Sequence, residues 1–365
     1  MTMEKTDNTA LIDGRQKLDF RNDGLLPPTE AMWRAMKEAS LNLEMAFSKV
    51  DPTISRLEEI CALLTGQEDA YMLPSATAAT VISLLAWDRK GELLVTESRS
   101  HLYWMQHFHY SVYGQMSVLP IEGDKFGVMD LAHIQKEVSK SAYNITLKTG
   151  VISVENTHTV CGGTVLTADY MKRLRQLADS LSAKVFLDGA RIFDAAVAQD
   201  VPVSALTSDA DAVVFSLNKG PRAPYGAMLC GSAEFIEKTR VEAERLGVNQ
   251  VHKGGIFAGA ALVGLTDNLE ARLKTNHQMA YLLATKLSEI PGISVDLETV
   301  QTNLVRASVR DTGLSAVEFA EQLAARGLGV RIVGSDAIRL VTHEGISEAD
   351  VDEAVDIVRQ VVASL

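Results

Sequence analysis

The segment Lys184-Val-Phe-Leu-Asp188-Gly-Ala-Arg191 says most about the fold of this chain. Its apolar residues lead straight to a carboxylate, and a glycine and an arginine follow. Short apolar runs bounded in this way are typical of strands that are buried on both faces of a parallel sheet. An unpaired carboxylate is unfavourable at such a place, so Asp188 needs a partner. The partner is either a ligand or the next helix, which Asp188 would cap with Arg191 as its surface partner.

Similar short runs alternate with longer helical patterns along most of the chain. The predicted strands are 70–73, 93–96, 116–119, 150–154, 184–187, 212–217 and 227–231. The predicted helices include 54–64, 77–87, 129–138 and 168–181. This alternation predicts parallel βαβ units with helices on both faces of the sheet. Ligands bind beyond the carboxyl ends of the strands in such sheets, so the residues after each strand are the candidates for chemistry.

The pattern changes near residue 266, where a long helical segment, 267–289, begins. The segments that follow it are shorter and mixed in type: 293–296, 304–309, 316–326, 330–333, 337–341 and 347–364. We therefore expect an α/β protein whose large domain, 31–265, holds a mainly parallel seven-stranded sheet. An N-terminal arm, 1–30, would precede this domain, and a smaller α+β domain, 266–365, would follow it.

The composition limits the classes of function. Asp and Glu number 47 against 35 Lys and Arg, a net charge of −12, which argues against binding to nucleic acid. Residues 1–18 lack the apolar core of a signal peptide, and no apolar run is long enough to span a membrane, so a cytoplasmic protein is expected. Cys61, Cys161 and Cys230 are too scattered for a disulfide framework or a zinc site, and we expect no metal.

A lysine follows another predicted strand in Phe215-Ser-Leu-Asn-Lys219-Gly-Pro-Arg222-Ala-Pro-Tyr-Gly226. If the end of that strand is enclosed, the amine of Lys219 loses hydration, its pKa falls, and the neutral amine can attack a carbonyl. The alternative is an ordinary lysine whose head reaches solvent.

Asp188 and Lys219 together suit a site for pyridoxal phosphate. This cofactor needs a lysine for its Schiff base and an acid against its ring nitrogen. It also needs a phosphate cradle, and the small, hydroxyl-rich turn Pro74-Ser75-Ala-Thr77-Ala-Ala-Thr80 opens a predicted helix, whose N–H groups can bind an anion. Serine and threonine before a helix are more often simple caps, so this turn is weak as an isolated signal.

The chain resembles the threonine aldolases of the β-eliminating lyase family, which have the aspartate-aminotransferase fold (fold type I). The resemblance runs from about Asp19 to the C-terminus. Its motifs, in order, are Asp19-Phe-Arg-Asn-Asp23, Asp51-Pro-Thr-Ile-Ser-Arg-Leu-Glu58, Ser75-Ala-Thr-Ala-Ala-Thr80, Glu155-Asn-Thr-His158 with Gly162-Gly163, Asp188-Gly-Ala-Arg191, Lys219-Gly and Arg339-Leu-Val-Thr-His343.

The resemblance implies a role for each of these site residues. Lys219 would form the Schiff base, Asp188 would pair with the pyridine nitrogen, and His101 would stack on the ring. His158 would lie near the substrate hydroxyl as a candidate base, although a structural role remains the alternative for both histidines. The other implied contacts are Ser75, Ala76 and Thr77 to the phosphate, Arg191 to cofactor and substrate, and Asn22 and Arg339 to the substrate.

The sequence also departs from the family pattern. Asn22 and Asn218 replace serines, Ser48-Lys49 replaces Tyr-Gly, Gln106 replaces a glutamate, and Ala76 and Arg222 replace glycines. The segment Val251-His-Lys-Gly254 lacks the arginine that reaches the phosphate of the neighbouring subunit in the family, so we expect Arg222, His252 or Lys253 to take over. These departures favour the same cofactor with a shifted substrate, such as a bulkier β-hydroxy amino acid.

The resemblance therefore implies an aldolase that cleaves a β-hydroxy-α-amino acid (L-threonine, allo-threonine or a bulkier analogue such as phenylserine) to glycine and an aldehyde. One alternative keeps pyridoxal phosphate but changes the reaction to β-elimination, transamination or racemisation. Another is a non-catalytic binding protein on this fold, although retention of Asp188 and Lys219 speaks against it. The family's site lies at a subunit interface, so a homodimer or homotetramer is expected.

Overall fold

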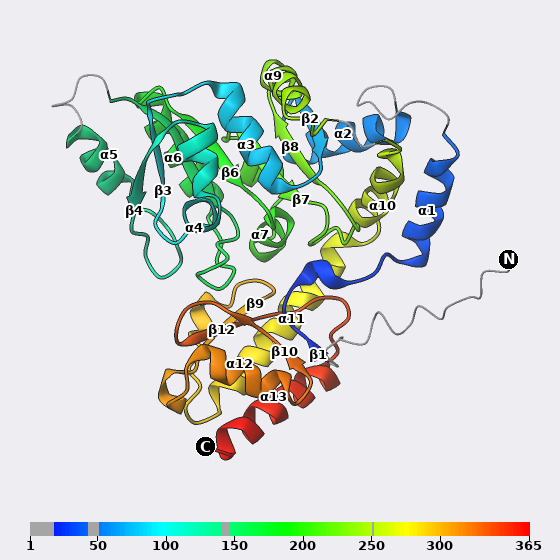
Figure 1. Ribbon diagram of the computed structural model, residues 1–365, viewed down its shortest axis with the longest axis vertical. Helices are drawn as coiled ribbons and strands as arrows, with labels where there is room; N and C mark the ends of the chain where they lie inside the picture. Colours follow the sequence, from blue (N-terminus) through cyan, green and yellow to red (C-terminus); the bar gives the residue numbers. More distant parts are fainter. Residues whose placement is uncertain (1–17, 43–50, 141–146, 250–251) are drawn as a thin grey trace, which may run out of the picture.

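The computed structural model of the chain describes residues 18–42, 51–140, 147–249 and 252–365, and a seven-stranded sheet is its central feature (Figure 1). The strands, in chain order, are β2 (Asp69–Leu73), β3 (Leu93–Glu97), β4 (Ser117–Ile121), β5 (Thr149–Glu155), β6 (Lys184–Asp188), β7 (Ala212–Ser216) and β8 (Ala227–Gly231). Their order in the sheet is β2-β8-β7-β6-β5-β3-β4. Strand β8 is antiparallel to both of its neighbours, and β7, β6, β5, β3 and β4 are parallel to one another. The predicted α/β class with a mainly parallel seven-stranded sheet is confirmed.

Helices cover both faces of this sheet. They are α1 (Glu30–Ser40), α2 (Pro52–Thr65), α3 (Ala76–Trp87), α4 (His101–Met105), α5 (Leu131–Lys140), α6 (Ala168–Ser180), α7 (Ile192–Gln199), α8 (Ser204–Thr207), α9 (Ala233–Arg245) and α10 (Gly255–Thr266). A π-helical turn, η3 (His109–Tyr113), follows α4. All seven strands predicted for the sheet are present, and so are the four helices predicted between residues 54 and 181. Their ends differ from the prediction by no more than about two residues, the usual uncertainty of helix and strand ends.

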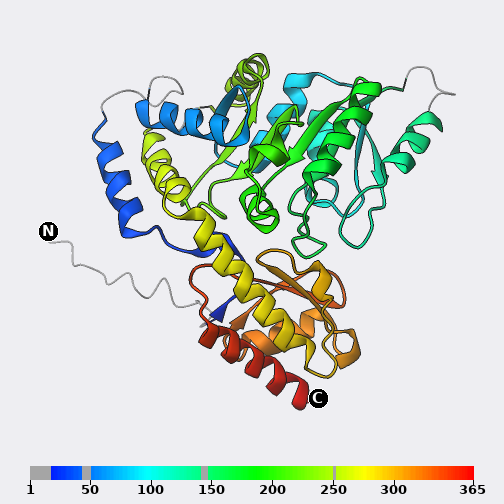
Figure 2. The ribbon, with the colours of Figure 1, turned by 180° about the vertical axis from the view of Figure 1, so that it is seen from behind.

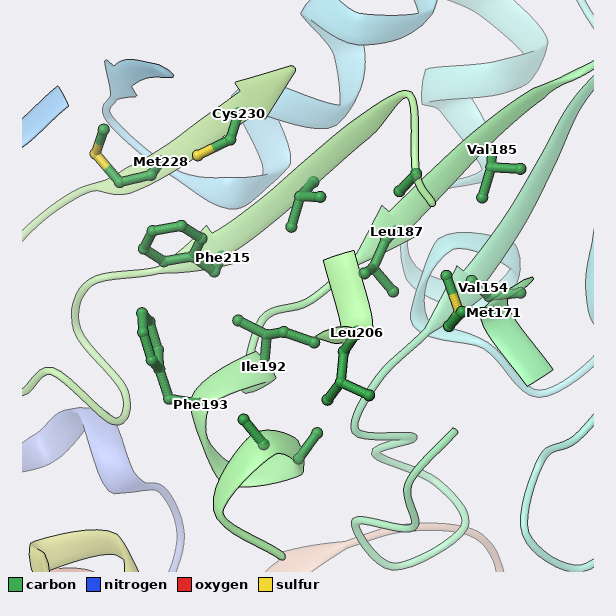
Figure 3. Close-up of a cluster of buried hydrophobic side chains, with 14 of the residues drawn as sticks. Val154, Met171, Val185, Leu187, Ile192, Phe193, Leu206, Phe215, Met228 and Cys230 are labelled. Carbon is green, nitrogen blue, oxygen red and sulfur yellow. The ribbon is translucent and has the colours of Figure 1, made fainter. Parts of the chain in front are cut away.

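Alternate residues of each central strand enter different cores, as the two-residue period of a strand requires. Val185 and Leu187 of β6 pack with α6 and α7 in one core, whereas Phe186 joins the core beneath α3 and α9. Figure 3 shows the first of these cores, with Leu187 and Phe215 of the strands above Ile192 of α7. Burial on both faces explains why these strands read as continuous apolar runs in the sequence.

The C-terminal third of the chain builds a smaller unit with its own core. Its elements are α11 (Leu269–Ser288), β9 (Leu304–Ser308), α12 (Ala316–Ala324), β10 (Leu328–Gly329), β11 (Arg331–Ile332), β12 (Ala337–Val341) and α13 (Glu348–Ala363). Strands β11, β12 and β9 form an antiparallel sheet. Of the shorter predicted segments, 293–296 forms only an isolated bridge, from Ser294 to Ser308, and 330–333 is reduced to the two residues of β11.

Helix α11 and the N-terminal segment connect the two units. Figure 2 shows α11 running from α10 into the smaller unit, where it lies beside α13. Its Leu273 belongs to the core of the large sheet, and its Leu283 belongs to the smaller core. Leu18 and Phe20 also enter the smaller core, and strand β1 (Leu18–Asp19) pairs with β10. The predicted boundaries after residues 30 and 265 stay predictions, and the part of the arm before residue 18 lies outside the described residues.

Within the described ranges, no helix is both long and apolar enough to cross a membrane.

Gly264 lets α10 pass close to the loop that carries Lys219. A Cβ atom at Gly264 would lie 1.9 Å from the carbonyl oxygen of Pro221, a backbone atom that cannot rotate away. At Gly259 in the same helix, the corresponding Cβ would lie 3.0 Å from the carbonyl oxygen of Ala35 in α1. The two glycines therefore offer a matched pair with a severe and a mild contact.

We predict that Gly264→Ala lowers the free energy of unfolding by about 3 kcal/mol, the upper end of the usual cost of overpacking. Gly259→Ala should cost less than about 1 kcal/mol, because a small shift of α1 relieves the contact and alanine is the better helix former. Equilibrium unfolding in urea would measure both variants. Equal losses of stability would contradict this account of the helix–loop contact.

Candidate active site

A pocket of about 310 Å³ opens at the carboxyl ends of the parallel strands. The residues that line it include Ser75, Ala76, Thr77, His101, Gln106, Glu155, Thr159, Asp188, Ser216, Lys219 and Tyr225. A larger hollow of about 760 Å³ lies between α7 and the start of α11. Most of the sequence-predicted cofactor groups line the smaller pocket, at the edge of the sheet where ligands are expected, so we take it as the candidate active site.

Two carboxylates stand side by side at the floor of this pocket. Glu155 ends β5, Asp188 ends β6, and the two residues are direct partners in the parallel ladder. Glu155 accepts hydrogen bonds from the backbone N–H groups of His101 (2.8 Å) and Thr159 (2.9 Å). Burial raises the pKa of Asp188, and the charge of Glu155 raises it further. Burial opposes ionisation of Glu155, yet attraction to His158 and the bond from the His101 N–H lower its pKa.

Lys219 reaches the same pocket from the loop after β7. Burial lowers the pKa of its amine, the positive charge of Arg191 lowers it further, and the result is about 8. The sequence predicted this direction from the position of the lysine at an enclosed strand end. At such a pKa, a substantial share of the amine is neutral and nucleophilic near physiological pH.

Arg191, at the N-terminus of α7, is held by a buried ion pair. Its Nε and Nη2 atoms donate to Asp23 Oδ2 (2.7 Å) and Oδ1 (2.9 Å), and Asn303 Nδ2 donates to the same carboxylate at 3.3 Å. Burial opposes ionisation of Asp23, but the charge of Arg191 holds the pKa of that carboxyl well below its usual range. The alternative in which Asp188 has Arg191 as a surface partner is not what the structure shows: Arg191 is buried against Asp23, and Asp188 accepts the backbone N–H of Ala190 at 3.1 Å.

Arg339, on β12 of the smaller unit, lies near this ion pair but is poorly neutralised. Its Nη2 atom donates a long bond of 3.5 Å to the Arg21 carbonyl, and its buried Nε has no hydrogen-bond partner among the described residues. Burial and the positive charge of Arg191 lower the pKa of its guanidinium to about 10. A buried guanidinium with an unused donor beside a second cation is suited to a ligand carboxylate.

The turn after β2 presents the N-terminus of α3 to the pocket. Ser75 caps this helix, since its Oγ accepts the N–H of Ala78 at 3.1 Å, as the simple capping alternative required. The backbone N–H groups of Ala76 and Thr77 lie in the first turn, where a helix leaves its donors without helical partners. The hydroxyl of Ser75 is therefore used as a cap, and the N–H groups that follow it lie where a helix N-terminus can bind an anion.

His101 begins α4 and lines the pocket together with Gln106. Gln106 Nε2 lies 3.1 Å from His101 Nδ1, and Gln106 Oε1 lies 3.2 Å from His109 Nδ1. His109 has a pKa lowered by burial and by the nearby His101 and His107. The predicted ring-stacking histidine thus stands at the pocket, and an amide side chain links it to a second histidine.

His158 does not line the pocket. It is buried, with Nε2 at 2.9 Å from Glu97 Oε2, and the Cys161 nitrogen lies 3.3 Å from its Nδ1. Burial alone would lower the pKa of His158, but the charge of Glu155 and the bond to Glu97 raise it, to about 10. A neutral ring that donates from Nε2 to Glu97 uses its Nδ1 lone pair for the Cys161 N–H, and a cationic ring has no lone pair. Neither form can accept a proton from the substrate. The placement therefore gives no support to a direct role of His158 as a base.

The other predicted contacts lie around the pocket or away from it. Asn22 caps the short helix η2 (Asp23–Leu25) through a bond from Gly24 N at 3.2 Å. Arg222 pairs with Glu344 of the smaller unit at 2.7 Å and donates to the Pro27 carbonyl at 3.1 Å. Lys253 donates to the Asn42 carbonyl, and His252 is exposed. Neither Arg222, His252 nor Lys253 lines the pocket of its own chain. Ser48 and Lys49 lie outside the described residues.

Sequence reasoning did not single out Asp23, Glu97 or Glu155 as separate site residues. For the two glutamates a signal was present: Glu97 ends β3 and Glu155 ends β5, as Asp188 ends β6. An acid at the last position of an apolar strand was the feature that identified Asp188, and it applies equally to both. Asp23 carried no such signal, because its partner Arg191 is distant in the sequence.

Comparison with known proteins agrees with this geometry. The profile of the family described as "Beta-eliminating lyase" matches residues 19–310. Low-specificity L-threonine aldolase 1 of Arabidopsis thaliana is 31% identical over 353 residues, which cover 96% of this chain and 98% of the relative. The low specificity L-threonine aldolase of Escherichia coli K12 is 29% identical and covers 92% of this chain and 96% of the relative.

A solved structure shows the same fold at lower sequence identity. The threonine aldolase of Leishmania major superimposes with a TM-score of 0.78 at 18% identity, covering 94% of this chain and 99% of that one. Since the family profile spans most of the chain and a relative above 30% identity covers nearly all of it, the chain belongs to the β-eliminating lyase family.

Proposed function

We propose that the chain is a pyridoxal phosphate-dependent aldolase, which cleaves the Cα–Cβ bond of a β-hydroxy-α-amino acid to give glycine and an aldehyde. The observation that carries the proposal is the meeting in one pocket of a partly neutral lysine amine, Lys219, and a buried strand-end carboxylate, Asp188. Relatives named as low-specificity threonine aldolases support this choice of reaction within the family.

The residues present fit the cofactor. Lys219 supplies the amine that binds it covalently, and Asp188 supplies the acid for its ring nitrogen. Ala76 and Thr77 supply backbone N–H groups for its phosphate, and His101 offers a flat ring at the pocket. When bound, pyridoxal phosphate supplies an electron sink for the electron pair left at the substrate Cα.

The substrate carboxylate would bind at Arg339. Its Nε is buried without a partner among the described residues, so a carboxylate there satisfies a donor that is otherwise lost. Asp23 occupies two of the donors of Arg191, so Arg191 would contribute through its remaining Nη1 atom and its charge. Asn22, next to Asp23, would complete this side of the site.

The proton of the substrate hydroxyl must leave to a group that lines the pocket. We propose that Glu155 accepts it, directly or through water, because this carboxylate lines the pocket and its lowered pKa keeps it ionised at neutral pH. We propose that His158 is a positioning residue, which acts through its ion pair with Glu97 and its attraction to Glu155.

Homodimer or homotetramer assembly and a cytoplasmic location remain part of the proposal. The exposed side chains of Trp104, Met105 and Phe108 lie on and after α4, next to the residues that line the pocket. Aromatic and methionine side chains exposed in this way are common at subunit interfaces. They support a partner subunit close to the mouth of the pocket.

Of the predictions about function, the first tests the reaction and the role of Lys219 together. With added pyridoxal phosphate, the protein should release glycine and an aldehyde from L-threonine or L-phenylserine, and borohydride should fix the cofactor to the peptide that contains Lys219. Lys219→Ala should lose covalent capture, and its turnover should fall by at least about a thousandfold, since no other amine takes over. Lys184→Ala, at the opposite end of the neighbouring strand β6, is the matched control.

The products decide between this proposal and its alternatives. Ammonia with a keto acid would indicate β-elimination, and capture of the cofactor without any product would move the assignment to another reaction of the cofactor. A protein that captures no cofactor at Lys219 would overturn the proposed function.

The second prediction concerns the pH dependence of cofactor capture. A pKa of about 8 for Lys219, in place of the ordinary value of about 10.4, raises the neutral fraction of the amine at pH 7.5 from about one in a thousand to about a quarter. The rate at which the cofactor-free protein takes up pyridoxal phosphate should therefore rise with pH and level off above about pH 8. A rate that continues to rise tenfold per unit up to pH 10 would contradict the lowered pKa.

The third prediction separates Glu155 from His158. Glu155→Gln should reduce kcat by about a hundredfold or more, the usual loss when a proton acceptor is removed. His158→Gln can still donate to Glu97 and should lose less than about tenfold, because its ring does not reach the pocket. Steady-state kinetics with L-threonine would measure both, with circular dichroism to check folding. A larger loss in His158→Gln than in Glu155→Gln would reverse the two roles.

A further inference from the structure

Gln106 connects two histidines at the wall of the pocket. It follows α4 directly, and only 4% of its surface is exposed. Its Nε2 lies 3.1 Å from His101 Nδ1, and its Oε1 lies 3.2 Å from His109 Nδ1. The amide group therefore has a donor at one end and an acceptor at the other, and each end meets an imidazole nitrogen.

The chemistry of these two contacts fixes where the ring protons lie. An amide N–H can donate to His101 Nδ1 only if this nitrogen keeps its lone pair, so a neutral His101 carries its proton on Nε2. At the other end, the amide oxygen accepts a proton from His109 Nδ1. Burial and the nearby histidines disfavour a positive charge on His109, so with the amide in this orientation the single ring proton of His109 lies on Nδ1.

Charged groups surround His101, so the contact with Gln106 bears on the protonation of its ring. The carboxylate of Glu155 at the end of β5 accepts the backbone N–H of His101, and Asp188 at the end of β6 and the amine of Lys219 after β7 line the same pocket. At Nδ1 the ring meets the N–H of Gln106, which opposes a proton on that nitrogen. The sequence resemblance places a glutamate at this position, and a carboxylate there would accept a proton from Nδ1 and favour the imidazolium.

We propose that Gln106 is a positioning residue that holds the His101 ring uncharged, with its proton on Nε2, at the wall of the pocket. The consequence for catalysis rests on the proposed function. A neutral ring stacks on the cofactor without adding a positive charge, and it acts toward the substrate as a hydrogen-bond donor. His101 is then unable to accept the hydroxyl proton, which leaves this task to Glu155.

The position of the ring proton on His101 can be measured directly by ¹⁵N NMR. In full-length protein labelled with ¹⁵N-histidine, with and without pyridoxal phosphate, the His101 ring nitrogens should show the Nε2–H form, with the spectrum of His101→Gln identifying its signals. In Gln106→Glu, the midpoint of the His101 titration should rise by about one pH unit or more, the usual effect of an adjacent carboxylate. Gln135→Glu, an exposed substitution on α5, adds the same charge elsewhere and should leave the titration unchanged.

Kinetics provide the second readout. In Gln106→Glu, the acidic limb of the profile of kcat/KM against pH should move upward with the His101 titration. Gln106→Met removes both hydrogen bonds without adding charge. It should therefore mix the two ring tautomers, lower kcat/KM, and move this limb upward by less than Gln106→Glu does, because the opposing N–H is lost but no carboxylate replaces it. If Gln106→Glu does not fold, His109→Phe carries the test, because loss of the acceptor contact should also mix the tautomers of His101.

The outcomes separate this inference from the proposed function. An unchanged His101 titration in Gln106→Glu, or an Nδ1–H form in the unmodified protein, would overturn the role of Gln106 whatever the reaction. If the ring signals behave as expected but no glycine is formed from any β-hydroxy amino acid, the role of Gln106 stands and the aldolase proposal fails.

Discussion

The buried ion pair between Arg191 and Asp23 is the interaction on which the rest of the site depends. Both groups are almost fully enclosed, and two hydrogen bonds join them in the bidentate geometry that makes such pairs strong. Removing one partner of a pair of this kind leaves an isolated buried charge, at a typical cost of about 3–5 kcal/mol. The pair joins the first residue before α7 to the N-terminal segment, and Asn303 of the smaller unit binds the same carboxylate. Three parts of the chain therefore meet at one carboxyl group.

The position of the lysine loop follows from this meeting point. Gly24, the residue after Asp23, packs so closely against Asn218 that a Cβ atom there would lie 2.9 Å from the Asn218 carbonyl oxygen. Asn218 is the residue before Lys219, so the segment that Arg191 anchors also limits where Lys219 can lie. The charge of Arg191 then lowers the pKa of the same lysine. The ion pair thus restricts the position of the amine, whereas burial is the main cause of its lowered pKa: Arg191 adds to this effect and Asp23 opposes it.

The sequence predicted a site residue best where a charged side chain directly follows an apolar run. It predicted a residue least well where the interaction partner of that residue is distant along the chain. The strands were predicted because burial on both faces leaves a continuous apolar run, and Asp188 and Lys219 stood out because a charge follows such a run. Asp23 gave no local signal, since its burial is a property of the fold. For His158, the motif gave a position in the chain but not the direction of the ring, and the carboxylate of Glu97 decides that direction. The segment 293–296 has strand-like residues, but only Ser294 pairs with a neighbour, at the end of β9.

Arg222 shows what the departures from the family pattern do to the structure. It occupies a position where the sequence resemblance expects glycine, and its φ of 62° lies in the left-handed region that glycine adopts freely. A side chain there is strained by about 1 kcal/mol or more, so a compensating contact is needed. The contact is Glu344 of the smaller unit, which Arg272 of α11 also binds. Because Arg222 lies shortly after Lys219 and Glu344 shortly after Arg339, this bridge joins the loop of Lys219 to the segment that follows the strand of Arg339. Arginine in place of glycine therefore restricts the backbone of the Lys219 loop and adds an ion pair between the two units. This ion pair limits how far Lys219 and Arg339, the proposed ligands of the cofactor and of the substrate carboxylate, can move relative to each other.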